Sequence, residues 1–236
     1  MRLLVTRPEP DAARTAEVLR ARGHQVLLAP LLRMEPIGAD LSGPWTAIVL
    51  TSANAARALA SHPEQRRLTG LPVLTVGDRS AQAAREAGFT DVASARGALA
   101  DLVGLAAARF AGNAGMLLYV AGEDRAGDIA GDLAAHGISV HTAVAYRMAA
   151  VAALPPWLTQ ALAAGEVDGA LHYSARSLAT LLKLAGEAGA LNAALNLAHY
   201  CLSAAVAEPL RERNAGRIMV AARPDEAALI DLIGAP

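Results

Sequence analysis

Short apolar runs alternate along this chain with longer Ala-rich stretches in which apolar residues recur at helical spacing. The runs are rich in Val, Leu and Ile and end in small or polar residues, a pattern typical of buried strands. This alternation predicts an α/β fold, in which each strand is followed by a helix that covers a parallel sheet. The predicted strands are 3–6, 25–28, 47–51, 73–76, 116–120, 139–142, 169–173, 198–202 and 217–220.

Most of these runs end in a small or polar segment that opens the next helix. Ser52, Ser174 and Ser203 occupy equivalent places in three such turns. Ser and Thr are favoured helix N-caps, so capping explains each of them. The same turns lie at the carboxyl edge of a parallel sheet, where ligands of open α/β sheets bind. Capping and ligand contact are therefore both open for each hydroxyl.

An internal repeat is the most informative feature of the chain. Segment 1–29 aligns without gaps with 115–143, so that Leu4 matches Leu118 and Gly23 matches Gly137. A chance similarity between Ala-rich βα units is the alternative, and the gapless match over a whole βαβ unit argues against it. Three further pairs follow in order, the last of them weaker: 47–59 with 169–181, 73–88 with 199–214, and 91–106 with 217–233.

The order of the repeated units predicts two domains, one inserted into the other. The discontinuous domain comprises 1–32 plus 152–236, the inserted domain comprises 42–141, and 33–41 and 142–151 form interdomain hinge strands. Each domain is expected to hold a small parallel sheet flanked by helices, with a two-stranded β hinge joining them. Two carboxyl edges would then face one cleft, where helix N-termini favour an anionic ligand.

Composition and charge exclude several classes of protein. A net charge of −1 over 236 residues lacks the basic excess of nucleic-acid binding proteins. No apolar run approaches the roughly 18 residues of a membrane-spanning helix, and the first residues lack a signal-peptide pattern. Cys201 is the single cysteine, which excludes an intramolecular disulfide framework. We expect a cytoplasmic monomer that binds neither nucleic acid nor membrane and holds no metal.

Candidate chemistry centres on Tyr146, because it lies on the second crossing strand beside the predicted cleft. A phenol can donate a proton to a leaving hydroxyl, although packing of the hinge is an alternative role. Tyr119, Tyr173 and Tyr200 are expected in the core. The candidate ligand-contacting residues lie mostly on strand-to-helix turns: Thr6, Arg7, Thr51, Ser52, Gly77, Asp78, Ser80, Gly122, Arg125, Ser174, Ala175, Ser203 and Ala204.

The histidines suggest no catalytic site. His172 could act as a base, but a lone His at a strand end is more often structural. His24, His136 and His141 are expected at solvated positions. The sequence contains no GxSxG, Walker, HExxH or GxGxxG motif in a suitable context. Chemistry here would rely on positioning and hydrogen bonding.

Several of these segments together resemble the uroporphyrinogen-III synthase family over essentially the whole chain. They are LLVTRPEPDA, IVLTSANAA, VLTVGDRSAQAAREAGF, LLYVAGEDRAGDIAGDLAAHGISVHTAVAYRM, HYSARSL and CLSAAVAEPL. The resemblance implies two α/β domains joined by a two-stranded ladder. It also implies cyclisation of hydroxymethylbilane to uroporphyrinogen III, with loss of water and inversion of the fourth pyrrole ring, in haem biosynthesis. The implied substrate is a polycarboxylate tetrapyrrole, and no cofactor is needed.

The resemblance also carries expectations for single residues. The family's Tyr falls on Tyr146 as a candidate acid, and family hydroxyls fall on Ser52, Ser80 and Ser174. Many members have a Gly-Pro-Thr-Thr-like turn where this chain has Ser-Ala-Ala-Val at 203–206, so a Thr contact there is lost. The competing hypothesis is a non-catalytic two-domain regulatory module that binds a small anion.

Overall fold

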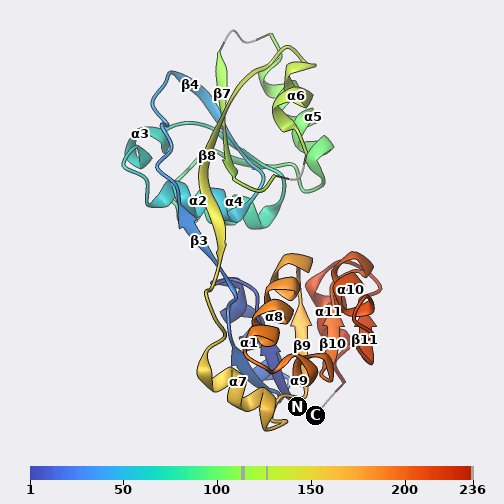
Figure 1. The fold of residues 1–236 in the computed structure, drawn as a ribbon. Helices are drawn as coiled ribbons and strands as arrows, with labels where there is room; N and C mark the ends of the chain where they lie inside the picture. Colours follow the sequence, from blue (N-terminus) through green and yellow to red (C-terminus); the bar gives the residue numbers. More distant parts are fainter. Residues whose placement is uncertain (113–114, 126, 235–236) are drawn as a thin grey trace. The chain divides into compact units, whose positions relative to one another are not determined.

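The computed structural model describes residues 1–112, 115–125 and 127–234 (Figure 1). The chain divides into two compact units. The first unit contains Met1–Arg33 and Ala149–Pro236, and the second unit contains Met34–Met148. Within the described residues, no helix has both the length and the apolarity to cross a membrane.

The first unit is built on a five-stranded parallel sheet in the order β11-β10-β9-β1-β2. Four helices on one face and two on the other enclose it, as the membership of its apolar clusters shows. The strands are β1 (Arg2–Val5), β2 (Gln25–Leu28), β9 (Gly169–His172), β10 (Ala198–Cys201) and β11 (Arg217–Val220). The helices are α7 (Pro156–Ala163), α8 (Ala175–Glu187), α9 (Leu191–Leu195) and α10 (Ala204–Arg211) on one face, and α1 (Asp11–Ala21) and α11 (Glu226–Asp231) on the other.

The second unit is built on a six-stranded sheet in the order β3-β8-β7-β4-β5-β6. Helices cover both of its faces. The strands are β3 (Leu32–Pro36), β4 (Trp45–Leu50), β5 (Val73–Thr75), β6 (Val92–Ser94), β7 (Met116–Gly122) and β8 (Ser139–Ala150). The helices are α2 (Ala53–Ala60), α3 (Gln65–Leu68) and α4 (Asp78–Glu86) on one face, and α5 (Leu99–Phe110) and α6 (Ile129–Ala134) on the other.

The period-two geometry of a strand explains why the buried residues 47–50 of central strand β4 are all apolar. Ala47 and Val49 belong to the cluster that includes α5 and α6, whereas Ile48 and Leu50 belong to the cluster that includes α2 and α4. Successive side chains of a strand point to opposite faces, so a sheet covered on both faces needs apolar residues at consecutive positions.

The two sheets share one strand order, which agrees with the internal repeat of the sequence. The run β11-β10-β9-β1-β2 corresponds to β6-β5-β4-β7-β8, strand by strand. The repeat also pairs α1 with α6, and each of these helices contributes to an apolar cluster of its own unit. The predicted α/β fold class, with two helix-flanked sheets, is confirmed.

The chain passes between the units within β3 and β8, which are neighbours in the six-stranded sheet. Ile37 N donates to Ala145 O, and Val151 N donates to Leu31 O at 3.0 Å. The residue number increases from 31 to 37 on one strand while it decreases from 151 to 145 on the other, so the two strands are antiparallel. Residues 139–142 and 142–151 were predicted as a sheet strand and a separate hinge strand, whereas β8 continues without a break from Ser139 to Ala150.

Candidate active site

A cavity of about 400 Å³ lies in the second unit, where β4 and β7 end and α2 begins. This is the carboxyl edge of the sheet, where sequence reasoning placed a ligand. Its lining combines hydroxyl, amide, charged and apolar groups. They come from β7 and β8, from the turns after β4, β5 and β7, and from the starts of α2 and α5. The lining residues are Thr51, Ser52, Asn54, Val76, Leu99, Tyr119, Gly122, Glu123, Asp124, Arg125, Tyr146 and Met148.

Tyr146 lies on β8 in this lining, with its side chain largely buried. Burial raises the pKa of the Tyr146 phenol, while a hydrogen bond with the Ser52 side chain lowers it and nearby Tyr119 raises it further. The phenol therefore stays protonated at neutral pH and has a hydroxyl beside it that favours the phenolate form. The Tyr146 phenol is thus a weak acid in the lining of the cavity.

Gly122 makes room for the Tyr146 ring. The two residues are register partners on β7 and β8, at a point where the register shifts. A Cβ atom added at Gly122 would lie 2.8 Å from Tyr146 Cζ and 3.0 Å from its hydroxyl oxygen. Any larger residue at 122 would push the phenol aside, so Gly122 controls the position of this side chain by its size.

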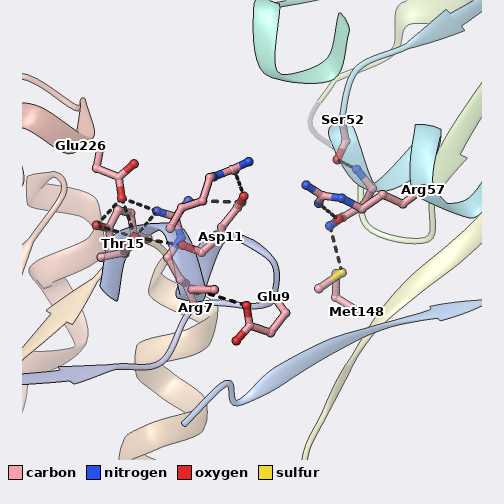
Figure 2. Close-up of polar contacts among 12 residues, drawn as sticks. Arg7, Glu9, Asp11, Thr15, Ser52, Arg57, Met148 and Glu226 are labelled. Atoms are coloured by element: carbon pink, nitrogen blue, oxygen red, sulfur yellow. Dashed lines mark hydrogen bonds and ion pairs between the residues drawn. The ribbon is translucent and has the colours of Figure 1, made fainter. Parts of the chain in front are cut away.

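Ser52 holds the start of α2 next to the phenol. Its hydroxyl accepts a hydrogen bond from Asn54 N at 3.1 Å, as a helix N-cap. The Asn54 side chain in turn accepts from Arg57 at 2.7 Å and contacts the Met148 sulfur at 3.4 Å (Figure 2). Ser52 is thus a helix cap and a partner of Tyr146 at once, while its contact with a ligand stays a prediction.

Tyr119 is the phenol of this site that the sequence did not reveal. It was expected in the core, and its ring does belong to an apolar cluster of the second unit. Its hydroxyl, however, lies 3.1 Å from Thr51 Oγ1 and lines the same cavity as Tyr146. The alignment of Val49 with Tyr119 brings Thr51 to the phenol, and such a cross-strand register is not visible in the sequence.

The charged side chains of the lining favour an anionic ligand less than the sequence led us to expect. Arg125 lines the cavity together with two acidic residues, Glu123 and Asp124. A polycarboxylate would gain little electrostatic attraction from such a set. The cavity is better suited to an uncharged polar group, such as a hydroxyl, than to a carboxylate.

In the first unit, Ser174 and Ser203 are both N-caps at the carboxyl edge of the sheet. Ser174 accepts from Ser177 N at 3.2 Å, and Ser203 accepts from Val206 N at 3.4 Å. Ala175 and Ala204 are the first residues of α8 and α10. These helix N-termini present amides and positive dipole ends, which favour an anionic ligand. Ligand contact by these residues stays a prediction.

Arg7 is held by acidic partners within the first unit. Its guanidinium forms ion pairs with Glu226 at 2.8 Å and with Asp11 at 3.3 Å, and it stacks on the Tyr173 ring at 3.8 Å (Figure 2). The same Glu226 oxygen also accepts from the Thr15 and Tyr173 hydroxyls. Arg7 therefore joins the end of β1 to α1 and α11, and its predicted ligand contact would compete with these bonds.

The remaining candidates fall outside the cavity lining. Thr6 follows β1 and is buried, and its hydroxyl finds no hydrogen-bond partner within the described part of the chain. Gly77 precedes α4, which begins with Asp78 and includes the buried Ser80. Asp78 is exposed and lies 3.7 Å from the Arg96 side chain. Ligand contact by these four residues stays a prediction.

Two expectations about histidines need correction or extension. His24 is buried rather than solvated, in the turn between α1 and β2, where its backbone N donates to Leu19 O. His172 is fully buried, as a structural role requires, but it is not a lone histidine, since its Nε2 lies 2.9 Å from His199 Nδ1.

These observations define a two-domain α/β protein with a hydroxyl- and phenol-lined cavity at the carboxyl edge of one sheet. The sequence model of the uroporphyrinogen-III synthase family, HemD, matches residues 13–231. The chain belongs to the uroporphyrinogen-III synthase family, and the resemblance seen in the sequence is confirmed. Enzymes of this family are cyclising lyases that convert hydroxymethylbilane in haem biosynthesis.

Solved structures add the fold to this result. The structure is similar to uroporphyrinogen-III synthetase from Helicobacter pylori 26695, with a TM-score of 0.65 and 18% identity over 98% of each chain. It is also similar to a uroporphyrinogen III synthase from Thermus thermophilus, with a TM-score of 0.43 and 19% identity over 98% of this chain and 97% of that one. No curated protein sequence matches significantly.

Proposed function

We propose that this protein forms uroporphyrinogen III from hydroxymethylbilane, and that Tyr146 protonates the leaving hydroxyl in the cavity of the second unit. The observation that carries the proposal is the Tyr146 phenol, which lines that cavity beside Ser52. The lining is polar but not cationic, so it suits the hydroxymethyl end of the substrate better than its carboxylates.

The chemistry required of Tyr146 is a single proton transfer. Loss of hydroxide from the hydroxymethyl carbon is unfavourable, whereas loss of water is assisted by a hydrogen-bonded acid and by electrons from the adjacent pyrrole. Ser52 would stabilise the phenolate that remains. The overall reaction releases one water and consumes no proton, so the phenolate regains a proton when the macrocycle closes.

The substrate carboxylates are assigned to helix N-termini. In the first unit, the caps Ser174 and Ser203 open α8 and α10, whose first amides can bind anions. In the second unit, the start of α4 at Gly77 offers a similar contact, whereas Arg125 lies in the cavity lining with Glu123 and Asp124 and attracts a carboxylate only weakly. Such contacts hold the flexible chain in a folded shape, which favours closure with inversion over spontaneous closure.

The test is the isomer of the product. Freshly generated hydroxymethylbilane closes spontaneously to the type-I isomer, and we expect the protein to yield mainly the type-III isomer. Tyr146→Phe should lower the rate of type-III formation by roughly 10- to 100-fold, because it removes the acid and keeps the ring. Chromatography of the oxidised products measures both isomers.

Gly122→Ala tests the position of the phenol while the residue itself is kept. Its Cβ would meet the far end of the Tyr146 side chain, so the ring should swing away and the backbone should remain. We expect a loss of roughly tenfold in rate with an unchanged circular dichroism spectrum. Type-III formation at the wild-type rate in both variants would remove Tyr146 from the acid role.

The competing proposal is a regulatory module that binds a small anion without turnover. Type-I product alone from the wild-type protein, together with saturable anion binding that survives in Tyr146→Phe, would favour that module. Such a result would overturn the synthase activity as a whole, not the role of one residue.

A further inference from the structure

We infer that Tyr119 is a second substrate-binding phenol of the site, oriented by Thr51 so that it holds the leaving oxygen while Tyr146 protonates it. The inference rests on the proposed function. It adds a residue that lies inside a strand and that the sequence pattern assigns to the core.

The first argument is location. Tyr119 is on β7 and Tyr146 is on β8, and these strands are neighbours in the sheet. The side chains of both residues are largely buried, and both line the same cavity. Tyr119 is also close enough to raise the pKa of Tyr146. The two phenols therefore belong to the lining of one cavity, although their rings pack in different apolar clusters.

The second argument is orientation. Thr51 Oγ1 and the Tyr119 hydroxyl lie 3.1 Å apart, so one donates a hydrogen bond to the other. If Thr51 donates, the Tyr119 proton is left to point into the cavity, and its donor strength is increased by the bond that it accepts. A hydroxyl-bearing residue at 51 and a phenol at 119 are both required for this arrangement.

The third argument is chemical need. The departing oxygen must be held in line with the Tyr146 proton while the carbon–oxygen bond breaks. A second donor on the same oxygen restricts its position and stabilises the negative charge that builds on it. The proton still comes from Tyr146, so Tyr119 leaves the proton balance of the reaction unchanged. Tyr119 acts by binding and orientation.

The test compares Tyr119→Phe with Thr51→Val, each of which removes one hydroxyl and keeps the side-chain shape. We expect Tyr119→Phe to lower kcat by about 5- to 10-fold with little change in KM, the size of one neutral hydrogen bond. Thr51→Val should have a smaller effect of the same kind. In the double variant the two effects should not multiply, because both residues serve one hydrogen bond.

A measurement without turnover supports the same point. Removing the Tyr119 hydroxyl should lower the pKa of Tyr146, which ultraviolet titration of phenolate absorbance reports. Tyr200→Phe is the matched control, since Tyr200 is a buried phenol of the first unit whose hydroxyl contacts only the Met1 sulfur, at 3.9 Å, among described side chains. We expect its kcat and KM to equal those of the wild type.

The outcomes separate this inference from the proposed function. Wild-type kinetics in Tyr119→Phe, beside an impaired Tyr146→Phe, would overturn the role of Tyr119 alone. Multiplying effects of Thr51→Val and Tyr119→Phe would overturn their action as a pair. Absence of type-III product from the wild-type protein would overturn the proposed function and this inference together.

Discussion

The buried pair His172 and His199 shows how hydrogen bonds fix the chemistry of single residues. His199 Nε2 lies 3.4 Å from Leu195 O, and a carbonyl only accepts, so this nitrogen carries the proton. His199 Nδ1 is then an acceptor, and His172 Nε2 donates to it at 2.9 Å. His172 Nδ1 bears no proton and has no partner within the described residues. Both rings are neutral in the folded protein.

This pair predicts a loss of stability in weak acid. Burial lowers the pKa of His172 to about 3 and that of His199 to about 4, against 6.5 for an exposed histidine. Well above pH 6.5 both rings are neutral in the folded and unfolded states. As the pH falls towards 4, these two histidines bind protons in the unfolded chain but stay neutral in the folded protein. The free energy of unfolding should fall by up to about 1.4 kcal/mol per pH unit and ring.

Urea unfolding at a series of pH values measures this slope. The two tryptophans lie one in each unit, so Trp157 fluorescence in a Trp45→Phe background reports on the first unit, which holds the pair. The exposed His136 gives the control, and His136→Gln should leave the slope unchanged. The double variant His172→Leu/His199→Leu should flatten the slope. An equal slope in the wild type and the double variant would contradict the assignment.

At the scale of single elements, the N-cap of α10 allows capping and substrate binding to be separated. Ser203→Ala removes the acceptor of Val206 N and should cost about 1 kcal/mol of stability. Ser203→Asp keeps a capping oxygen and favours the helix dipole, so stability should be retained. If substrate carboxylates bind there, the added charge should raise KM by roughly tenfold, equivalent to about 1.4 kcal/mol.

Thermal unfolding and steady-state kinetics of the two Ser203 variants give the answer. If Ser203→Ala is destabilised and both variants keep the KM of the wild type, Ser203 is only a cap. The substrate contact proposed at the start of α10 would then be wrong, while the proposed reaction would stand.

The elements themselves were largely predictable, because each is encoded locally. The apolar runs at 25–28 and 217–220 match β2 and β11, and Ser52, Ser174 and Ser203 cap the helices that they precede. The continuity of β8, which joins the predicted strand 139–142 to the predicted hinge strand 142–151, was not predictable from its pattern. Its residues beyond 142 mix buried and exposed positions, and their strand geometry depends on pairing with β3.

The site was only partly predictable, because its partners come from distant segments. Tyr146 and Ser52 were found from their places relative to predicted strands, and the structure brings them into one cavity. The bond of Arg7 to Glu226 joins residues at opposite ends of the chain, and a local pattern carries no sign of it. The sequence pattern places Tyr119 in the core, and its ring does pack in an apolar cluster. Only its hydroxyl, beside Thr51, belongs to the site.

At the scale of the whole molecule, the division of the chain predicts two units that fold independently. The second unit is continuous in sequence and carries two apolar clusters of its own. The first unit consists of two chain segments. The end of the first segment lies next to the start of the second, since Val151 N donates to Leu31 O across an antiparallel pair. Antiparallel neighbours can be joined by a two-residue turn.

We therefore expect Met34–Met148 to fold alone, and the first unit to fold when Arg33 is joined to Ala149 through Asn-Gly. Each piece should unfold cooperatively in urea, with Trp45 reporting on the second unit and Trp157 on the first. A splice that instead deletes β11 removes an edge strand and part of the first unit's core, and should abolish cooperative unfolding. A non-cooperative transition in either intact piece would show that its core depends on the other unit for stability.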